Sequence, residues 1–450
     1  MRETDTICAV ATSMSESAIN IIRISGEDSI NIVNGIFLGA NLLNKDGFTL
    51  TYGRIINKSK EIIDEVLVSV FRAPKSYTRE NMVEINTHGG SFVTTQVLEL
   101  LLESGCRLAD PGEFTKRAFL NGRIDLSQAE AVMDMISSST KNSLLLANKA
   151  LRGEVKTLVQ ELRKRIEDIL LHITVNIDYP EYIDELQVTN RLCIDETQAL
   201  INTLEVIIKN AEVNRVYKEG IKTVILGKPN VGKSSLLNAL LKEDKAIVTD
   251  ISGTTRDIVE GEINIDGIIL HLIDTAGIRK TDDPIEKIGI KKSLNMLSEA
   301  ELVLLVLDES SELTDEDKLL ISETEGKTRI IIGNKSDLNK AFSDIQNILE
   351  ISSKTGSGID LLKQKIKDLF IRENIAKSSD LIISSSRHIS ILKNALSCLK
   401  EANINAINNE FIDMVEIDLK EAYKYLGDII GESSPDELID ELFKKFCLGK

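Results

Sequence analysis

The chain contains the octapeptide Gly227-Lys228-Pro229-Asn230-Val231-Gly232-Lys233-Ser234, which matches the G-x-x-x-x-G-K-S pattern of phosphate-binding loops. An apolar run, Val224–Leu226, precedes it, and a helical pattern with Leu236, Leu237 and Leu240 follows it. Glycines in such a loop let backbone N–H groups converge on phosphate oxygens at a helix N-terminus. The strand-loop-helix context argues against a chance glycine-rich turn, so the octapeptide predicts a site for nucleotide phosphates.

Two side chains of this loop have roles that follow from their chemistry. We expect Lys233 to neutralise the β and γ phosphates and the Ser234 hydroxyl to bind Mg²⁺. The other expected nucleotide contacts come from the loop and the first helical turn, at Asn230, Val231, Gly232 and Ser235.

The surroundings of the loop read as an α/β domain. From Ile221 to about Phe370, short apolar runs alternate with polar helical stretches, which indicates a mostly parallel sheet covered by helices. The runs are Val224–Leu226, Ile268–Ile273, Leu302–Leu307, Arg329–Ile332 and Ile348–Ile351.

Three further motifs follow these strands in an order typical of guanine-nucleotide sites. Asp274-Thr275-Ala276-Gly277 would hold Mg²⁺ through water at its Asp and sense the γ-phosphate with the Gly277 N–H. In Asn334-Lys335-Ser336-Asp337, the carboxylate can accept two hydrogen bonds from guanine, and leaving it buried and unpaired would reject adenine. Ser352-Ser353-Lys354 suits a backbone contact to the guanine oxygen. Together the four motifs predict GTP binding.

Hydrolysis of GTP needs a group that orients water, and the usual one is missing. Ras-like enzymes carry Gln directly after the Asp-x-x-Gly motif, whereas this chain has Ile278, which can neither donate nor accept a hydrogen bond through its side chain. Substitutes lie in Thr249-Asp250-Ile251-Ser252-Gly253-Thr254-Thr255-Arg256-Asp257 and in Arg279–Glu286. The first segment offers Thr255 for Mg²⁺ and the catalytic candidates Arg256 and Asp257.

Asn230 has two interpretations. Its side-chain oxygen lies inside the phosphate loop, and with carbonyls of the Thr249 segment it can hold a monovalent cation. Such a cation would act where an arginine finger, worth about 10³–10⁵ in rate, acts in other GTPases. On spacing alone, a loop-shaping role is favoured.

Composition bounds the rest of the chain. It has 450 residues and a net charge of −17, with 42% hydrophobic and 28% charged residues, which excludes a mainly disordered chain and a uniformly basic nucleic-acid coat. The 5 Cys are scattered and form no Cys-x-x-Cys pair, which favours a reducing cytosol over a disulfide framework. The acidic start lacks a signal core, and no apolar stretch is long enough to span a membrane, so we expect a cytoplasmic protein.

Three textures divide the chain. Residues 1–120 read as strands followed by the helix Ser91–Glu103; the strands are Ile19–Ile24, Thr49–Ile56, Val66–Phe71 and Met82–Asn86. Long amphipathic helices fill residues 121–219, the α/β pattern fills 220–375, and helices return in 376–450. The two helical segments are either separate domains or one domain interrupted by the α/β domain, and the residues alone favour neither.

Several stretches resemble the bacterial tRNA modification GTPase family MnmE (also called TrmE). The resemblance runs along essentially the whole chain. It is carried by Ile21–Gly26, Asn86–Gly90, Pro111–Phe114, Arg117–Leu126, Gly253–Asp257 and the terminal Cys447-Leu448-Gly449-Lys450. The GTPase motifs are shared with many families, whereas the N-terminal stretches and the terminal tetrapeptide are specific.

The resemblance implies a multidomain architecture. An N-terminal α+β folate-binding domain dimerises, and an all-α helical domain is interrupted by an inserted α/β Ras-like P-loop GTPase domain. It also implies potassium-stimulated GTP hydrolysis, in which two GTPase domains pair transiently. Family members work with an FAD-dependent partner, MnmG (GidA), and together they build an aminomethyl or carboxymethylaminomethyl group on C5 of the wobble uridine of certain tRNAs.

The resemblance also assigns roles to single residues. The residues that match K⁺ ligands are Asn230, Thr249, Ile251 and Thr254, and those that match Mg²⁺ ligands are Ser234 and Thr255. Glu286 would position the attacking water in place of the absent Gln. The residues that match the site for a one-carbon tetrahydrofolate are Arg23, Glu84, Arg123 and Lys450, with Cys447 as a catalytic candidate beside them.

The sequence departs from the family pattern in places, and a second function stays open. Tyr77–Asn81 carries Arg79 where Gly is usual, Ser13–Ser17 replaces a glycine-rich turn, and Arg123 stands where Lys is common. The alternative is a GTP-dependent switch protein in ribosome assembly. The N-terminal stretches and the terminal tetrapeptide favour the tRNA function, because an assembly GTPase has no need for them.

Overall fold

The computed structural model describes residues 5–178, 183–243, 261–273, 297–342, 345–370, 382–432, 435–446 and 449. The chain forms two compact units. The first comprises residues 1–136, 148–200 and 394–450, and the second comprises residues 137–147 and 201–393.

The first unit begins with a sheet that is antiparallel except for the parallel pairing of its first and last strands. Within residues 5–178 it has seven strands in the order β3-β4-β5-β6-β2-β1-β7. The strands are β1 (Ile7–Val10), β2 (Ile19–Ser25), β3 (Phe37–Gly39), β4 (Thr49–Ile56), β5 (Ile62–Phe71), β6 (Met82–His88) and β7 (Arg107–Leu108). The helices between them are α1 (Ser29–Ile36), the single turn η1 (Leu42–Asn44) and α2 (Ser91–Glu103). The four predicted strands and the predicted helix are thereby confirmed; β1, β3 and β7 were not predicted.

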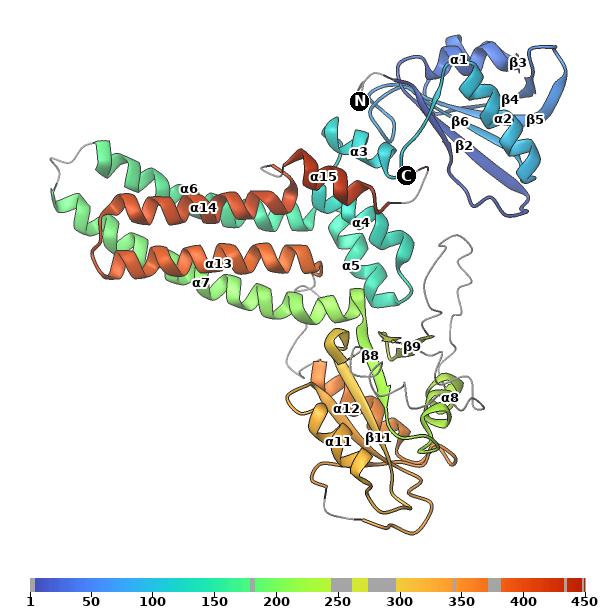
Figure 1. The fold of residues 1–450 in the computed structure, drawn as a ribbon. Coiled ribbons are helices and arrows are strands. Elements are labelled where there is room, and N and C mark those ends of the chain that lie inside the picture. The colour runs from blue at the N-terminus through green and yellow to red at the C-terminus, as the bar shows by residue number, and fades with distance from the viewer. Residues whose placement is uncertain are drawn as a thin grey trace. The chain divides into compact units, whose positions relative to one another are not determined.

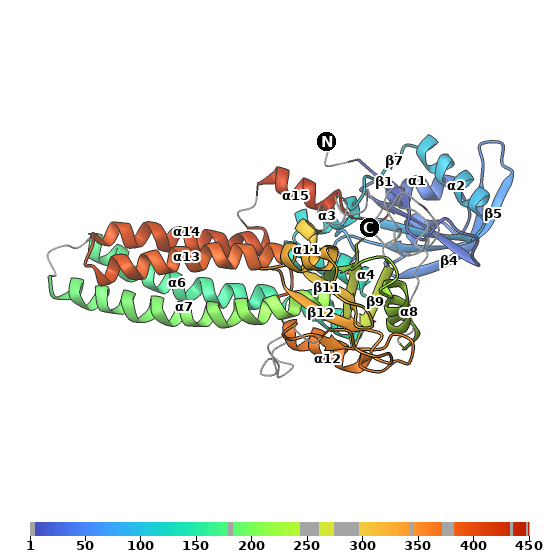
Figure 2. The same cartoon turned by 60° about the horizontal axis from the view of Figure 1, so that its bottom comes forward.

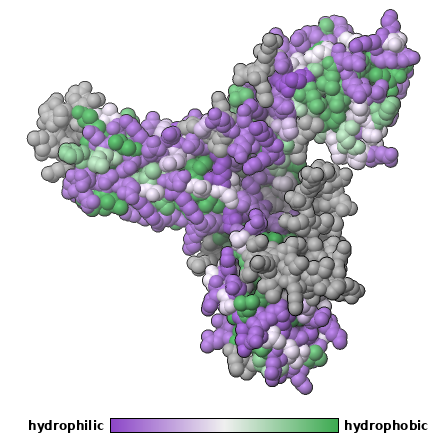
Figure 3. Space-filling model, viewed as in Figure 1, coloured by the Kyte–Doolittle hydropathy of each residue, from purple (hydrophilic) through white to green (hydrophobic). Residues whose placement is uncertain are grey.

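Alternation along the strands gives this sheet two different faces. In β5, Val66, Val68 and Val70 are buried, because the period of two turns them toward α1 and α2, which cover one face (Figures 1 and 2). On the other face, Tyr52 lies opposite Leu67, and both are exposed. Figure 3 shows hydrophobic residues grouped on the visible surface of this part.

The end of the chain packs onto the N-terminal part. Helix α15 (Asp436–Phe443) contacts α3 (Glu113–Leu120), and Lys116 pairs with Asp440. The Phe443 ring lies 6.3 Å from that of Phe119 and 5.0 Å from that of Phe446. The contact is tight at Gly112 (φ +72°), where an added Cβ would lie 2.5 Å from the Phe443 carbonyl oxygen.

Helices from both sides of the α/β segment pack against one another. The helices before it are α4 (Leu126–Ser137), α5 (Lys141–Leu151), α6 (Glu154–Asp178) and α7 (Ile183–Glu219), and those after it are α13 (Ser386–Ile407) and α14 (Ile412–Ile430). Helix α6 lies beside α14 and α7 beside α13 (Figures 1 and 2). The guanidinium of Arg163 stacks 4.0 Å from the Tyr423 ring centre, and Asn403 Nδ2 donates to Thr197 Oγ1 over 2.8 Å. The helical segments therefore make one domain, and the α/β domain is an insertion in it.

The second unit contains the α/β sheet. The described residues form six strands in the order β13-β12-β11-β8-β10-β9, all parallel except β9, which pairs antiparallel with β10. The strands are β8 (Ile221–Leu226), β9 (Gly261–Ile265), β10 (Ile268–Leu272), β11 (Leu302–Asp308), β12 (Arg329–Asn334) and β13 (Leu349–Glu350). The helices are α8 (Lys233–Glu243), α11 (Asp315–Glu323) and α12 (Ile359–Phe370). The mostly parallel sheet is confirmed; the edge strand β9 was not predicted.

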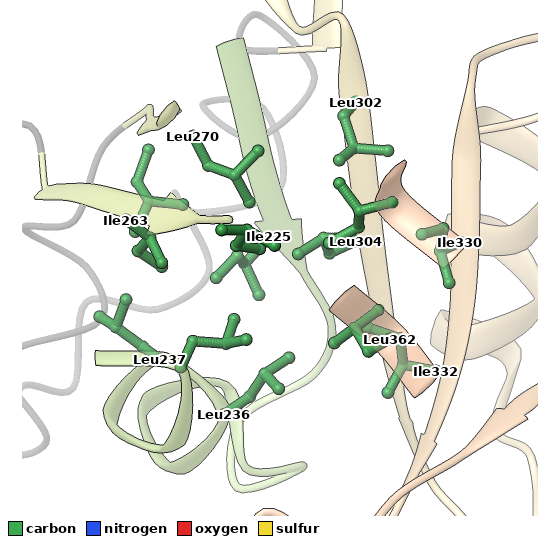
Figure 4. Close-up of a cluster of buried hydrophobic side chains, with 14 of the residues drawn as sticks. Ile225, Leu236, Leu237, Ile263, Leu270, Leu302, Leu304, Ile330, Ile332 and Leu362 are labelled. Atoms are coloured by element: carbon green, nitrogen blue, oxygen red, sulfur yellow. The ribbon is translucent and has the colours of Figure 1, made fainter. Parts of the chain in front are cut away.

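Apolar side chains cover both faces of this sheet. On one face, Ile225, Leu304 and Ile332 pack against Leu236 of α8 and Leu362 of α12 (Figure 4). A second cluster, with Leu305 of β11 and Leu320 of α11, occupies the other face. Burial on both faces explains the nearly continuous apolar runs of these strands. Among the described residues, no helix has the length and apolar character needed to cross a membrane.

We predict that Gly112→Ala lowers the free energy of unfolding of the first unit by about 2–4 kcal/mol, because alanine resists a positive φ and its methyl group collides with Phe443. The measurements are thermal melting, and hydrogen exchange of residues 436–446.

Gly105→Ala is the matched control. Gly105 also has a positive φ of +111°, but nothing lies within 4 Å of an added Cβ. Its cost should be limited to about 1–2 kcal/mol of backbone strain. Equal costs for the two variants would contradict a tight contact at Gly112.

Candidate nucleotide site in the inserted domain

Three of the four predicted motifs meet at one edge of the α/β sheet. The phosphate loop follows β8. The second motif begins at Asn334, the last residue of β12, and ends at Asp337, and the third motif, Ser352–Lys354, follows β13. Because β8, β12 and β13 are parallel, their carboxyl ends lie at the same edge. The described residues therefore place these motifs where α/β proteins bind nucleotides.

The phosphate loop has backbone conformations that its sequence permits. Gly232 has φ +98°, and an added Cβ would lie 2.2 Å from the Asn334 amide nitrogen, so only glycine fits. Asn230 has φ +63° and an exposed side chain. Asparagine tolerates this left-handed conformation better than most residues, which gives Asn230 a loop-shaping role in the structure.

Lys233 and Ser234 begin helix α8 directly after the loop. Lys233 Nζ donates to the carbonyl oxygens of Gly227, at 2.6 Å, and Lys228, at 2.8 Å. The ammonium group thus lies against the loop that phosphates would enter. The positive end of the helix dipole adds to its charge at this point.

Asn334 connects the motifs to one another. It is buried, and its Nδ2 donates to the Val231 carbonyl over 2.8 Å. Its Oδ1 accepts hydrogen bonds from the N–H of Ser353, at 3.0 Å, and from the Ser353 hydroxyl, at 2.9 Å. One amide side chain therefore holds the phosphate loop and the Ser352–Lys354 loop in fixed relative positions.

Asp337 is exposed, whereas the sequence argument assumed a buried carboxylate. Its Oδ1 accepts a hydrogen bond of 2.6 Å from the Ser352 hydroxyl, and this bond lowers the pKa of Asp337 below its usual value. The carboxylate is consequently ionised at neutral pH and ready to accept hydrogen bonds. Because Asp337 is exposed, its carboxylate can lose its water only when a base covers it. Selectivity for guanine over adenine would therefore depend on the base that binds.

Sequence reasoning missed Asp308 at this edge. Asp308 ends β11, and its Oδ2 lies 2.5 Å from the Nζ of Lys335. Burial alone would raise the pKa of Asp308, but hydrogen bonds from Lys335 and Ser310 lower it. The available signal was its position directly after the apolar run Leu302–Leu307, as in the other strand-end motifs.

Three of the four predicted folate residues lie in the described part, and two of them contact one aromatic ring. Arg23 and Arg123 lie over the Tyr77 ring, with guanidinium-to-centroid distances of 5.5 and 4.8 Å. Arg23 Nε also pairs with Glu84 at 2.9 Å, in cross-strand register between β2 and β6. Arg123 Nη1 donates to the Tyr77 carbonyl over 2.8 Å.

Gly449 contacts this cluster. Arg23 Nη1 donates to the Gly449 carbonyl over 3.2 Å, and an added Cβ at Gly449 would lie 2.5 Å from the Val10 carbonyl oxygen. Residues from β2, β6 and the end of the chain are therefore brought together, although 426 positions separate Arg23 from Gly449.

Other predicted site residues lie outside the described part of the chain. They are Thr249, Ile251, Thr254, Thr255, Arg256, Asp257, Asp274, Thr275, Ala276, Gly277, Glu286, Cys447 and Lys450.

Comparisons with known proteins cover the whole chain. A family model described as the N-terminus of the GTP-binding protein TrmE matches residues 6–123, and one described as the MnmE helical domain matches residues 126–447. The chain is 48% identical over 453 residues to the tRNA modification GTPase MnmE of Streptococcus thermophilus (strain CNRZ 1066). It is 47% identical over 454 residues to that of Streptococcus pyogenes serotype M28 (strain MGAS6180), and 46% over 452 residues to that of Lactococcus lactis subsp. lactis (strain IL1403).

Each of these three matches covers 100% of this chain and 99% of the relative. The chain belongs to the MnmE family of tRNA modification GTPases.

Proposed function

We propose that this chain hydrolyses GTP in the modification of tRNA. Acting with an MnmG (GidA)-like FAD protein, it contributes to adding an aminomethyl or carboxymethylaminomethyl group to C5 of the wobble uridine of certain tRNAs. The observation that carries the GTP part is the link that Asn334 makes between the phosphate loop and the Ser352–Lys354 loop. The tRNA part rests on the full-length similarity to tRNA modification GTPases.

Guanine selectivity is assigned to Asp337. Its ionised carboxylate is aimed by Ser352 and can accept the two N–H groups that guanine presents and adenine lacks. Asn334 positions the loops on either side, while Ser353 and Lys354 complete the base site.

The phosphate end is assigned to the loop and to helix α8. Lys233 exchanges its two carbonyl partners for phosphate oxygens, and Val231, Gly232 and Ser235 add N–H or hydroxyl contacts. The Ser234 hydroxyl, at the first turn of α8, is a hard oxygen donor of the kind Mg²⁺ prefers. Bound Mg²⁺ would neutralise charge that develops on the phosphates, with Thr255 as a second protein ligand and Asp274 acting through water.

In this proposal, GTP is hydrolysed when the inserted domains of two chains pair. A K⁺ ion would then lie between the phosphate loop and the phosphates of GTP. The exposed amide of Asn230 offers an oxygen donor inside the loop, which fits an alkali cation. The other proposed ligands are Thr249, Ile251 and Thr254. Glu286 takes the water-positioning role that Ile278 cannot fill, with Arg256 and Asp257 beside it.

A homodimer through the N-terminal sheet is part of the proposal. The face turned away from α1 and α2 exposes apolar side chains on the neighbouring strands β4 and β5, among them Leu50, Tyr52 and Leu67. Contiguous exposed apolar surface of this kind is typical of an interface. A second copy of the chain would bury it.

Folate binding is assigned to the cluster around Tyr77. The guanidinium groups of Arg23 and Arg123 suit the carboxylates of a one-carbon tetrahydrofolate, and the nearby Tyr77 ring suits its flat ring system. Glu84, Lys450 and Cys447 complete the proposed site.

The experiment that tests the function is nucleoside analysis of tRNA from cells that lack this protein. We expect the C5-substituted wobble uridines to disappear and to return when the chain is supplied again. Unchanged wobble uridines together with aberrant rRNA precursors would instead support a role in ribosome assembly.

Asp337→Asn should weaken GTP binding by roughly 10- to 100-fold, because an amide cannot accept two hydrogen bonds as a charged acceptor does. Fluorescent GTP and xanthosine triphosphate titrations measure the effect. Xanthine presents an acceptor where guanine has its amino donor, so the variant should gain affinity for it. Unchanged GTP affinity in this variant would show that Asp337 does not bind the guanine base.

GTP turnover should depend on K⁺ and be slower in Na⁺ at equal ionic strength by roughly 10-fold or more, as expected when a cation replaces an arginine finger. Steady-state phosphate release measures the rates. Asn230→Ala should abolish the difference between the two salts. Equal rates in K⁺ and Na⁺ for the unaltered protein would contradict the cation proposal.

A further inference from the structure

The second residue of the phosphate loop is held from outside the loop. Lys228 Nζ lies 2.6 Å from Asp317 Oδ2 and 3.1 Å from the Thr314 hydroxyl oxygen. Thr314 and Asp317 form the start of helix α11, on a different element of the inserted domain. The two charged side chains are 16% and 3% exposed, so this pair is largely shielded from water.

Asp317 binds Lys228 with the same oxygen that caps the helix. Its Oδ2 accepts hydrogen bonds from the N–H and the hydroxyl of Thr314, both at 2.9 Å. Its Oδ1 is buried and has no hydrogen-bond partner among the described residues. A buried carboxylate with one unsatisfied oxygen is costly, so the ion pair with Lys228 is strongly favoured over separated charges.

The backbone of Lys228 connects this anchor to the phosphate site. Its carbonyl oxygen accepts the hydrogen bond from Lys233 Nζ, as does that of Gly227. On the far side of the loop, Asn334 holds the Val231 carbonyl. The loop is therefore fixed at two places, by Asp317 at residue 228 and by Asn334 at residue 231.

We propose that Lys228 and Asp317 are positioning residues for nucleotide binding. Their ion pair holds the first half of the phosphate loop in the conformation that receives phosphate, and neither side chain contacts the nucleotide. This inference rests on the proposed GTP binding. Loss of the pair lowers the population of binding-competent loop, which weakens affinity by that factor and leaves the rate at saturation unaltered.

The test uses the full-length chain, fluorescent GDP and GTP, and four variants of the pair. We expect Lys228→Met and Asp317→Asn each to weaken both nucleotides by roughly 3- to 10-fold, with kcat for GTP within about two-fold of the unaltered protein. The double variant should be no weaker than either single variant, because the two residues act as one unit. Lys228→Arg should bind within about two-fold, since the charge and a donor remain.

Asp317→Asn removes the negative charge of the ion pair but keeps a side-chain oxygen. Its side-chain oxygen can still accept from the Thr314 N–H, so α11 should keep its start. Lys367→Met is the matched control, because Lys367 pairs with Asp266 at 3.0 Å elsewhere in the same unit. Its nucleotide affinities should not change.

Three results would overturn the inference. If Lys228→Met weakened nucleotide affinity and Asp317→Asn did not, Lys228 would contact phosphate directly. Effects that multiply in the double variant would mean that the residues act independently. A lower melting temperature with unaltered affinities would mean that the pair only stabilises the fold. Absence of nucleotide binding by the unaltered protein would instead refute the proposed function.

Discussion

The backbone pairing of strand β8 is the interaction on which the inserted domain depends. β8 hydrogen-bonds to β10 on one side and β11 on the other, so both of its edges are satisfied inside the protein. Its side chains are buried on both faces, with Ile225 in one cluster and Val224 in the other. A strand fixed in this way leaves little freedom at its end. The phosphate loop therefore starts from an immobile point, and only local contacts remain to shape it.

A long insertion in the helical domain is tolerated for a related reason. Helices α6 and α14 come from opposite sides of the inserted domain and pack along their lengths. The entropic cost of closing such a long connection grows only with the logarithm of its length. An apolar interface between the helices, with residues such as Ile166 and Leu426 fully buried, is ample compensation. Folding of this domain must nevertheless bring together helices that are far apart in the sequence, such as α6 and α14.

Periodicity explains which elements were predictable from the sequence. β2, β4 and α2 carry regular patterns of burial over many residues, and their predicted bounds agree with the structure to within one residue. β3 and β7 have three and two residues, too few for a period to show, and their pairing is decided by neighbouring strands. The strand-loop-helix around Lys233 was predictable because the chemistry of phosphate binding requires a particular local sequence.

Pairs of residues far apart in the chain were not predictable in the same way. Two examples are the ion pairs Lys335–Asp308 and Lys228–Asp317. The order of the strands in the sheet brings their partners together, and the sequence composition does not reveal that order. The same holds for Arg23 and the Gly449 carbonyl. For Asp337, the sequence indicated the chemistry of the side chain but not its exposure. That exposure depends on the conformation of the loop after β12.

These pairs also bear on which lysine would contact the phosphates in the proposed nucleotide site. Lys228 and Lys335 each lie within 2.6 Å of a carboxylate oxygen, so their charges are largely compensated within the protein. Lys233 donates to the carbonyls of Gly227 and Lys228. A lysine that already pairs with a carboxylate would gain little by exchanging it for a phosphate oxygen, so Lys228 and Lys335 are poor candidates for the phosphate contact that we propose for Lys233.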